Sequence, residues 1–363
     1  MFVECGIMTT FIAEKSNGLV AGGNANEAPV LQRFGGGMLN LFASPKVGHC
    51  TFYDNTAVWG GAMANIFAAP RIVNCAFLRM EDDPYYSDEN LAVGGGAIAN
   101  WGGRVIWGDG PLIEGCTFDS NWAILIGGGV YNFDSPMELV GSRFSYNESY
   151  AGGGVANWQT FDWIGGPFVG SCEFSENITS LPDGQGSFGG AFFSWSGENV
   201  SSSRLEMENC LFHHNATGVD NGSAMVFHTE SSGGQPMIVN CTIADNETGG
   251  IAWDGIATPF VTNSILWNNG THEILPDCDG GAAVTYSDVM GGGGCEDLTG
   301  NISEDPKFDS TSPFAPFSIQ SSSPCVDTAN PLMYPVTDIT GAYRVPPPDM
   351  GAYEHLAADE EEQ

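Results

Sequence analysis

Aromatic residues recur at one position of a repeated phrase, at a spacing that could place their rings in a row. Each follows a Gly-Gly phrase, on consecutive repeats: Trp101, Phe133, Trp158 and Trp195. The segments beside them carry further rings, carboxylates and a guanidinium: Trp107, Asp109, Asp162, Trp163 and Arg104. Aromatic faces with nearby carboxylates suit the C–H faces and hydroxyls of sugars. A row of rings can equally pack in a core or at an edge, so both interpretations stay open.

The direction of these rings depends on strand alternation. Trp101 falls on the opposite side of its strand from Ile98 and Asn100, because successive side chains of a strand alternate between its two faces. If Ile98 and Asn100 point inward, Trp101 is exposed, whereas a bend at Asn100 would reverse its direction.

Residues that could hold a metal ion are sparse. Asp82 and Asp83 lie in an acidic segment and are a weak calcium candidate, although a solvated loop explains this pair more simply. The six histidines are scattered and no Cys-x-x-Cys pair occurs, so the spacing typical of a zinc site is missing. We expect no cofactor, with calcium as the one candidate ion.

The charge balance excludes some partners. The 363 residues include 44 acidic and 10 basic side chains, for a net charge of −34. Such a surface repels nucleic acid phosphates and anionic lipids and favours solubility. This charge opposes nucleic acid binding. No apolar run is long enough to span a bilayer, so we expect no membrane insertion either.

No signal peptide is seen at the start of the sequence. The segment from Cys5 to Ile7 already resembles a repeat phrase, and we therefore expect an incomplete N-terminus.

Two short phrases alternate along the chain and predict its architecture. Cys-x-Phe-x-x-Asn begins at Cys50, Cys116, Cys172 and Cys210. Gly-Gly-(Gly/Ala)-apolar-x-Asn begins at Gly60, Gly95, Gly127 and Gly152. Such a period indicates a stacked solenoid. The shortest repeats take 23 to 25 residues, which suits three short strands and three bends. We therefore predict an all-β, right-handed parallel β-helix of about ten coils over residues 1–300. A C-terminal capping module follows at 301–355, and an acidic tail at 356–363.

The positions within the repeat predict two interior ladders. The cysteine and the apolar residue two positions later share one strand face, which must be the inner face. The cysteine ladder comprises Cys50, Cys75, Cys116, Cys172, Cys210 and Cys241. An asparagine at the following turn would stack on its neighbours, and this ladder comprises Asn55, Asn121, Asn147, Asn177, Asn215, Asn246 and Asn269. Ladder thiols point alongside one another and should stay free. Cys278 and Cys295 lie outside the ladder and are candidates for a disulfide.

The repeats and the C-terminal segment resemble known families. The pairing of Phe-x-x-Asn with Gly-Gly-Ala resembles the repeats of chlamydial polymorphic outer-membrane proteins, which are adhesins. The phrases 305–308, 323–330, 338–344 and 349–354 resemble the closing module of secreted bacterial right-handed β-helix proteins of the choice-of-anchor type. These resemblances imply an extracellular or cell-surface protein, and some such proteins are described as pectin-lyase-like from their fold alone.

The sequence favours a binding function over a catalytic one. Polysaccharide lyases of this fold need calcium-binding carboxylates and an Arg or Lys base, and no lysine lies between Lys46 and Lys307. We expect a non-catalytic adhesion or polysaccharide-binding protein whose partner is a polysaccharide or cell-surface glycan. The alternatives are a polysaccharide lyase or glycoside hydrolase of the pectate-lyase-like fold, and a purely structural surface spacer.

Overall fold

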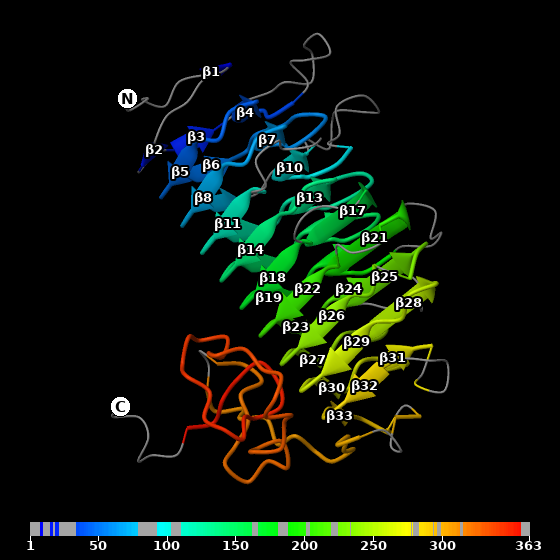
Figure 1. The fold of residues 1–363 in the computed structure, drawn as a ribbon. Helices are drawn as coiled ribbons and strands as arrows, with labels where there is room; N and C mark the ends of the chain where they lie inside the picture. The colour runs from blue at the N-terminus through cyan, green and yellow to red at the C-terminus, as the bar shows by residue number, and fades with distance from the viewer. Residues whose placement is uncertain are drawn as a thin grey trace.

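Three long parallel sheets form the body of the molecule (Figure 1). The computed structural model describes residues 34–78, 93–102, 110–161, 166–180, 188–200, 204–218, 224–232, 234–276, 278, 283–292, 294–295, 299–312 and 315–356, with the backbone of three short strands before residue 34. The chain visits the three sheets in turn, and each new strand pairs in parallel with the strand one coil earlier. This is a parallel β-helix, as the repeat predicts.

Each sheet contains ten strands in coil order. Sheet A consists of β1 (Met8–Thr9), β4 (Met38–Leu41), β7 (Met63–Ile66), β10 (Ile98–Trp101), β13 (Val130–Phe133), β17 (Val155–Phe161), β21 (Phe192–Asn199), β25 (Met225–Thr229), β28 (Ile251–Gly255) and β31 (Ile274–Leu275). Sheet B consists of β2 (Lys15–Ser16), β5 (Lys46–Gly48), β8 (Arg71–Val73), β11 (Leu112–Glu114), β14 (Glu138–Val140), β18 (Phe168–Gly170), β22 (Glu206–Glu208), β26 (Met237–Val239), β29 (Phe260–Thr262) and β32 (Ala283–Thr285). Sheet C consists of β3 (Leu19–Ala21), β6 (Thr51–Tyr53), β9 (Ala76–Leu78), β12 (Thr117–Asp119), β15 (Arg143–Ser145), β19 (Glu173–Ser175), β23 (Leu211–His213), β27 (Thr242–Ala244), β30 (Ile265–Trp267) and β33 (Asp288–Val289). A small fourth sheet joins β16 (Glu148–Ser149), β20 (Ile178–Thr179) and β24 (Ala216–Thr217).

The turns explain the Gly-Gly phrase. Gly127 has φ +66, and a Cβ there would lie 2.3 Å from the carbonyl oxygen of Val130. A Cβ on Gly128 would lie 2.4 Å from the carbonyl oxygen of Gly153, in the next coil. The first glycine is therefore required by the backbone conformation and the second by the close approach of the neighbouring coil.

Phenylalanines of sheet C stack inside the helix. Consecutive rings along the run Phe52, Phe77, Phe118, Phe144, Phe174 and Phe212 have centroids 4.5–4.8 Å apart and are nearly parallel. All of them are fully buried. The six ladder cysteines lie beside this stack and are buried, and none of the six forms a disulfide. The same column contains Ser142, Ser264 and Ser287. Each serine hydroxyl accepts a hydrogen bond from the backbone N–H of the column residue one coil earlier. A cysteine sulfur does the same elsewhere, as Cys116 does for Cys75.

The asparagine ladder is a chain of side-chain hydrogen bonds. Each amide Nδ2 from Asn121 to Asn246 donates to Oδ1 of the next asparagine, over 2.7–3.0 Å. The last member, Asn269, donates instead to the Glu273 carboxylate at 2.5 Å. A second ladder, which the sequence did not predict, links Asn40, Asn65 and Asn100 within sheet A.

The first coil does not begin as the sequence suggests. Strand β1 pairs Met8 and Thr9 with Met38 and Leu39 in sheet A, whereas the Cys-x-Phe phrases form strands of sheet C. The interpretation of Met8 and Thr9 as part of a Cys-x-Phe phrase is therefore wrong. Cys5 itself lies outside the described residues.

The C-terminal segment packs against the side of the later coils (Figure 1). After β33 its described residues form turns and isolated bridges. Asn209, Asn240 and Asn263, each at the turn before β23, β27 or β30, hydrogen bond to it. Within it Arg344 and Glu354 form a buried ion pair at 3.0 Å. A disulfide joins Cys278, before β32, to Cys295, after β33.

Candidate functional site

One column of side chains on the outer face of sheet A contains the predicted aromatic residues. Ile98 and Asn100 are buried inside, so Trp101 points outward, as strand alternation requires. The strand register continues this column from coil to coil through Trp101, Phe133, Trp158, Trp195, His228 and Asp254. The row of rings therefore lies on the outside of the helix. We call it the outer column.

A second outward column lies two residues earlier on each strand, and it is buried. Tyr131, Ala156, Phe193, Val226 and Ala252 all face away from the core and yet are at most 8% exposed. The larger rings around them provide the cover, and they form a hydrophobic cluster separate from the core. Because Val226 and Ala252 are smaller than their neighbours, the surface is hollowed above them.

The hollow is a groove of about 520 Å³, which we call the aromatic groove. Its floor is formed by Phe193, Val226 and Ala252. On one side lie Trp158 and Trp195, whose ring centroids are 4.7 Å apart and whose planes meet at 28°. Tyr150 and Phe188 lie in the turns before β17 and β21 and form the other wall. The groove thus offers flat apolar surface on both sides.

Polar groups lie where the aromatic groove reaches the later strands β25 and β28. His228 stacks parallel to Trp195, with centroids 6.3 Å apart. Its Nδ1 is 2.5 Å from Oδ1 of Asp254, and its Nε2 is 3.7 Å from Oε1 of Glu230. The Asp254 side chain is 70% exposed, so one carboxylate oxygen remains accessible to a ligand. An imidazole and a carboxylate beside aromatic faces can bind sugar hydroxyls while the sugar ring contacts the apolar wall.

The structure brings together only part of the site predicted from sequence. Trp158 and Trp195 line the groove, whereas Trp101 contacts Trp59 and Phe133 nearer the N-terminal end of the column. Outside the described residues lie Trp107, Asp109, Asp162, Trp163 and Arg104, together with the calcium candidates Asp82 and Asp83. Among the described residues no three His, Cys, Asp or Glu side chains gather as a metal site.

Sequence reasoning missed the other wall and the polar end. Tyr150 and Phe188 occupy the turn before sheet A, where the repeat has no fixed residue type. His228 and Asp254 occupy the same column as Trp158, two and three coils further along. Aligning the Gly-Gly strands beyond the aromatic members could therefore have found the polar end, but not the second wall.

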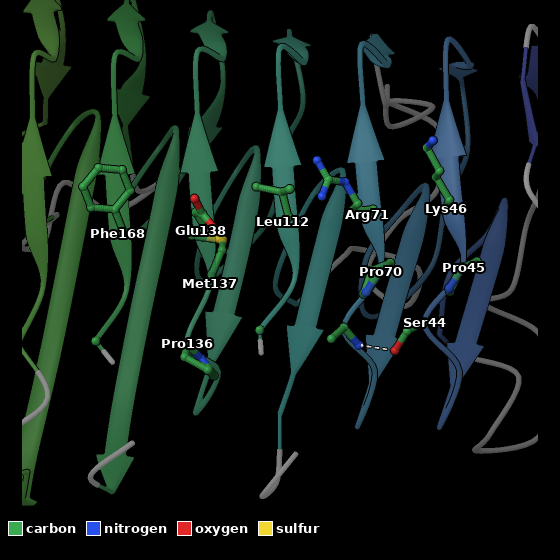
Figure 2. A pocket seen from close by; sticks show the side chains of 13 residues that line it. Ser44, Pro45, Lys46, Pro70, Arg71, Leu112, Pro136, Met137, Glu138 and Phe168 are labelled. Atoms are coloured by element: carbon green, nitrogen blue, oxygen red, sulfur yellow. Dashed lines mark hydrogen bonds between the residues drawn. The ribbon is translucent and has the colours of Figure 1, made fainter. Parts of the chain in front are cut away.

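A second groove crosses the outer face of sheet B near its junction with sheet A (Figure 2). Its volume is about 580 Å³. Prolines line one side, and the first residues of successive sheet B strands line the other: Lys46, Arg71, Leu112, Glu138 and Phe168. We call this the proline groove. It has more polar surface than the aromatic groove and includes two basic side chains.

The buried carboxylates lie away from both grooves. Burial raises the pKa of Glu273 to about 7 and the pKa values of Asp288 and Asp349 to about 6. Each is hydrogen-bonded to the backbone of a turn or of the C-terminal segment. Their contacts join parts of the fold, and none of them lines the aromatic groove.

Comparison with models of known protein families, with curated proteins and with solved structures finds no match to this chain. Nor do the described residues include a helix long and apolar enough to cross a membrane.

Proposed function

We propose that this chain is an extracellular or cell-surface protein that binds a polysaccharide or cell-surface glycan without catalysis. The observation that carries the proposal is the aromatic groove, where Trp158 and Trp195 line one wall and His228 and Asp254 lie at one end. Sugars have apolar C–H faces and polar rims, so a wall of rings with hydroxyl-binding groups at one end matches both features.

The direction of the groove supports an extended ligand. Its lining residues come from the successive strands β17, β21, β25, β28 and β31, so it runs along the helix axis. Coils lie about 4.8 Å apart, which gives the groove room for several sugar units in a row. A linear glycan lying along the axis would meet a new strand at each step.

The net charge and the disulfide support an extracellular location for this protein. The net charge of −34 opposes binding of nucleic acid. The disulfide between Cys278 and Cys295 suits an oxidising compartment, because thiols in the cytosol are kept reduced. Both features fit a protein outside the cell.

A glycan array with matched tryptophan variants tests the proposal. Trp158→Ala and Trp195→Ala should each reduce retention of the bound glycan about tenfold, because each loses a stacking surface worth about 1 kcal/mol or more. Trp101→Ala is the matched control: it lies in the same outer column but outside the groove, and should bind like the wild type. If no glycan is retained, or if the Trp101 variant loses binding as strongly as the other two, the proposal is wrong.

The same preparation tests the enzymatic alternative. Incubation of the retained glycan with the protein should leave it intact. New reducing ends would indicate a hydrolase, and unsaturated products that absorb ultraviolet light would indicate a lyase.

A further inference from the structure

The proline groove combines an unusual charge with a regular spacing. The whole chain has ten basic residues, and two of them, Lys46 and Arg71, are direct neighbours here. The strand register pairs Lys46 with Arg71 across β5 and β8, and both side chains are exposed. Figure 2 shows them side by side on the outer face of these strands. Two positive charges one coil apart are unusual on a chain with a net charge of −34.

The two cations are only partly neutralised. Arg71 Nη2 lies 3.3 Å from Oε2 of Glu114, and both side chains are about half exposed. Exposed pairs of this kind contribute about 1 kcal/mol or less, so a ligand anion can compete for the guanidinium. No ion pair of Lys46 is found within the described residues. Glu138, the acidic residue that lines the groove, comes two strands after Arg71 in sheet B.

The rest of the groove mixes polar and apolar groups in a repeating order. Pro45, Pro70 and Pro136 recur along one side, while Leu112, Glu138 and Phe168 continue the row that starts with the two cations. Because each coil contributes one such residue, the groove repeats about every 4.8 Å along the helix axis. A polymer with one charged group per unit could bring successive anions to Lys46 and Arg71 while its apolar faces contact Pro136, Leu112 and Phe168, which are partly exposed.

The fold argues against other polymers. A peptide that binds by strand addition needs an open sheet edge. Here β5, β8, β11 and β14 each pair with a strand on both sides, so the groove offers no unpaired backbone. Nucleic acid would need many phosphate contacts to overcome the charge of −34, and two cations are too few. A glycan that carries carboxylate or sulfate groups meets the remaining requirements.

We propose that the proline groove is a second binding site, for a linear acidic glycan held by Lys46 and Arg71. This site lies on sheet B and does not depend on the aromatic groove of sheet A. The acidic surface elsewhere repels such a ligand, but at physiological salt this repulsion is screened beyond about 8 Å. Affinity therefore comes from contacts within the groove.

Isothermal titration at physiological salt tests the proposal with three probes of equal length: an oligouronate, a sulfated oligosaccharide and a neutral oligosaccharide. The wild type should bind at least one acidic probe and bind the neutral probe at least tenfold more weakly. The double variant Lys46→Gln, Arg71→Gln should lose at least tenfold in affinity for that acidic probe, because charge-assisted hydrogen bonds are stronger than neutral ones. Whether the oligouronate or the sulfated probe binds more tightly identifies the charged group.

Controls separate this site from the aromatic groove and from misfolding. Arg204→Gln removes an exposed cation that does not line the groove and should leave the affinity unchanged. Arg204 lies just before β22 of the same sheet and pairs with Glu206. Trp158→Ala should also leave it unchanged, so the failure of one site does not imply failure of the other. Circular dichroism should show the double variant folded, because both side chains are exposed. Equal affinity of wild type and double variant, equal affinity for acidic and neutral probes, or equal loss in the Arg204 variant would each overturn the proposal.

Discussion

Two aromatic rows run along this helix, one inside sheet C and one outside sheet A. Inside, neighbouring phenylalanines from Phe52 to Phe212 are nearly parallel, with interplanar angles of 1–9°. Outside, the rings of Trp101 and Phe133 meet at 53° and those of Trp158 and Trp195 at 28°. The inner rings are fully buried, whereas those of the outer column are only partly covered.

The difference follows from what each row contacts. An inner ring has the next coil above it, the previous coil below it and the core beside it, so one orientation fills the space. An outer ring packs on the column beneath it and on rings of neighbouring coils, but it is partly exposed to solvent. The residue type of the outer column changes from coil to coil until His228 and Asp254 replace the rings. The inner row is constrained by packing. The outer column is free to vary, and it is where the fold can hold a ligand.

The largest expected effect is on the inner row. Phe144→Ala should reduce the free energy of unfolding by about 3–5 kcal/mol, because it leaves a cavity between Phe118 and Phe174. Phe133→Ala, in the outer column, should cost about 1–2 kcal/mol, since its ring is only partly buried. Chemical denaturation of both variants measures the difference, and equal losses would show that the two rows contribute alike to the fold.

The next effect concerns the end of the asparagine ladder. Burial raises the pKa of Glu273 from 4.5 to about 7. Between these values the unfolded chain releases its proton while the folded chain keeps it, so the unfolded state binds fewer protons and stability falls as pH rises. The fall should approach about 3 kcal/mol in total; it begins near pH 4.5, continues as pH rises through the folded-state pKa near 7, and levels off about one pH unit above it.

The variant Glu273→Gln isolates this contribution. Its amide oxygen can still accept from Asn269, whose N–H and Nδ2 donate to the carboxylate in the wild type. Asp288 and Asp349 also have raised pKa values, of about 6, so they contribute below that pH. Denaturation curves between pH 6 and 7 should therefore be flatter for the variant. An unchanged slope would assign the pH dependence to the general acidic charge.

Spacing in the sequence predicted the fold and the ladders, for a physical reason. Each inner column has room for only one type of side chain in every coil. Phenylalanine, as at Phe118, and asparagine, as at Asn147, therefore recur at fixed positions of the repeat, and the sequence shows both directly. The first coil is predicted wrongly because the segment after Cys5 resembles the phrase locally, while the hydrogen-bond register of β1 with β4 assigns Met8 and Thr9 to sheet A. Local similarity cannot replace that register.

The candidate site was only partly predictable, because it depends on contacts between different columns. The spacing identified Trp158 and Trp195, but Tyr150 and Phe188 come from turns of variable length. The proline groove was missed for another reason. Lys46 and Arg71 each stand four residues before a ladder cysteine, so the repeat could have aligned them, but spacing alone does not show that the surface is hollowed beside them.

The smallest effect should come from exchanging a thiol for a hydroxyl in the inner cysteine column. Cys116 Sγ accepts from the backbone N–H of Cys75, as Ser142 Oγ accepts from that of Cys116. Cys116→Ser should therefore cost about 1 kcal/mol or less, because the hydrogen bonds persist and the volume barely changes. Cys116→Val, which fills the space but cannot accept, is the matched control and should cost about 1–3 kcal/mol more through the orphaned N–H.

Thiol titration checks the inner cysteine column itself. Of ten cysteines two are bridged, so eight should react after denaturation without reductant, and those in the column should react slowly in the native protein. Fast native reaction of the column thiols would mean that the inner ladder is open to solvent, and the contrast between the inner and outer rows would then fail.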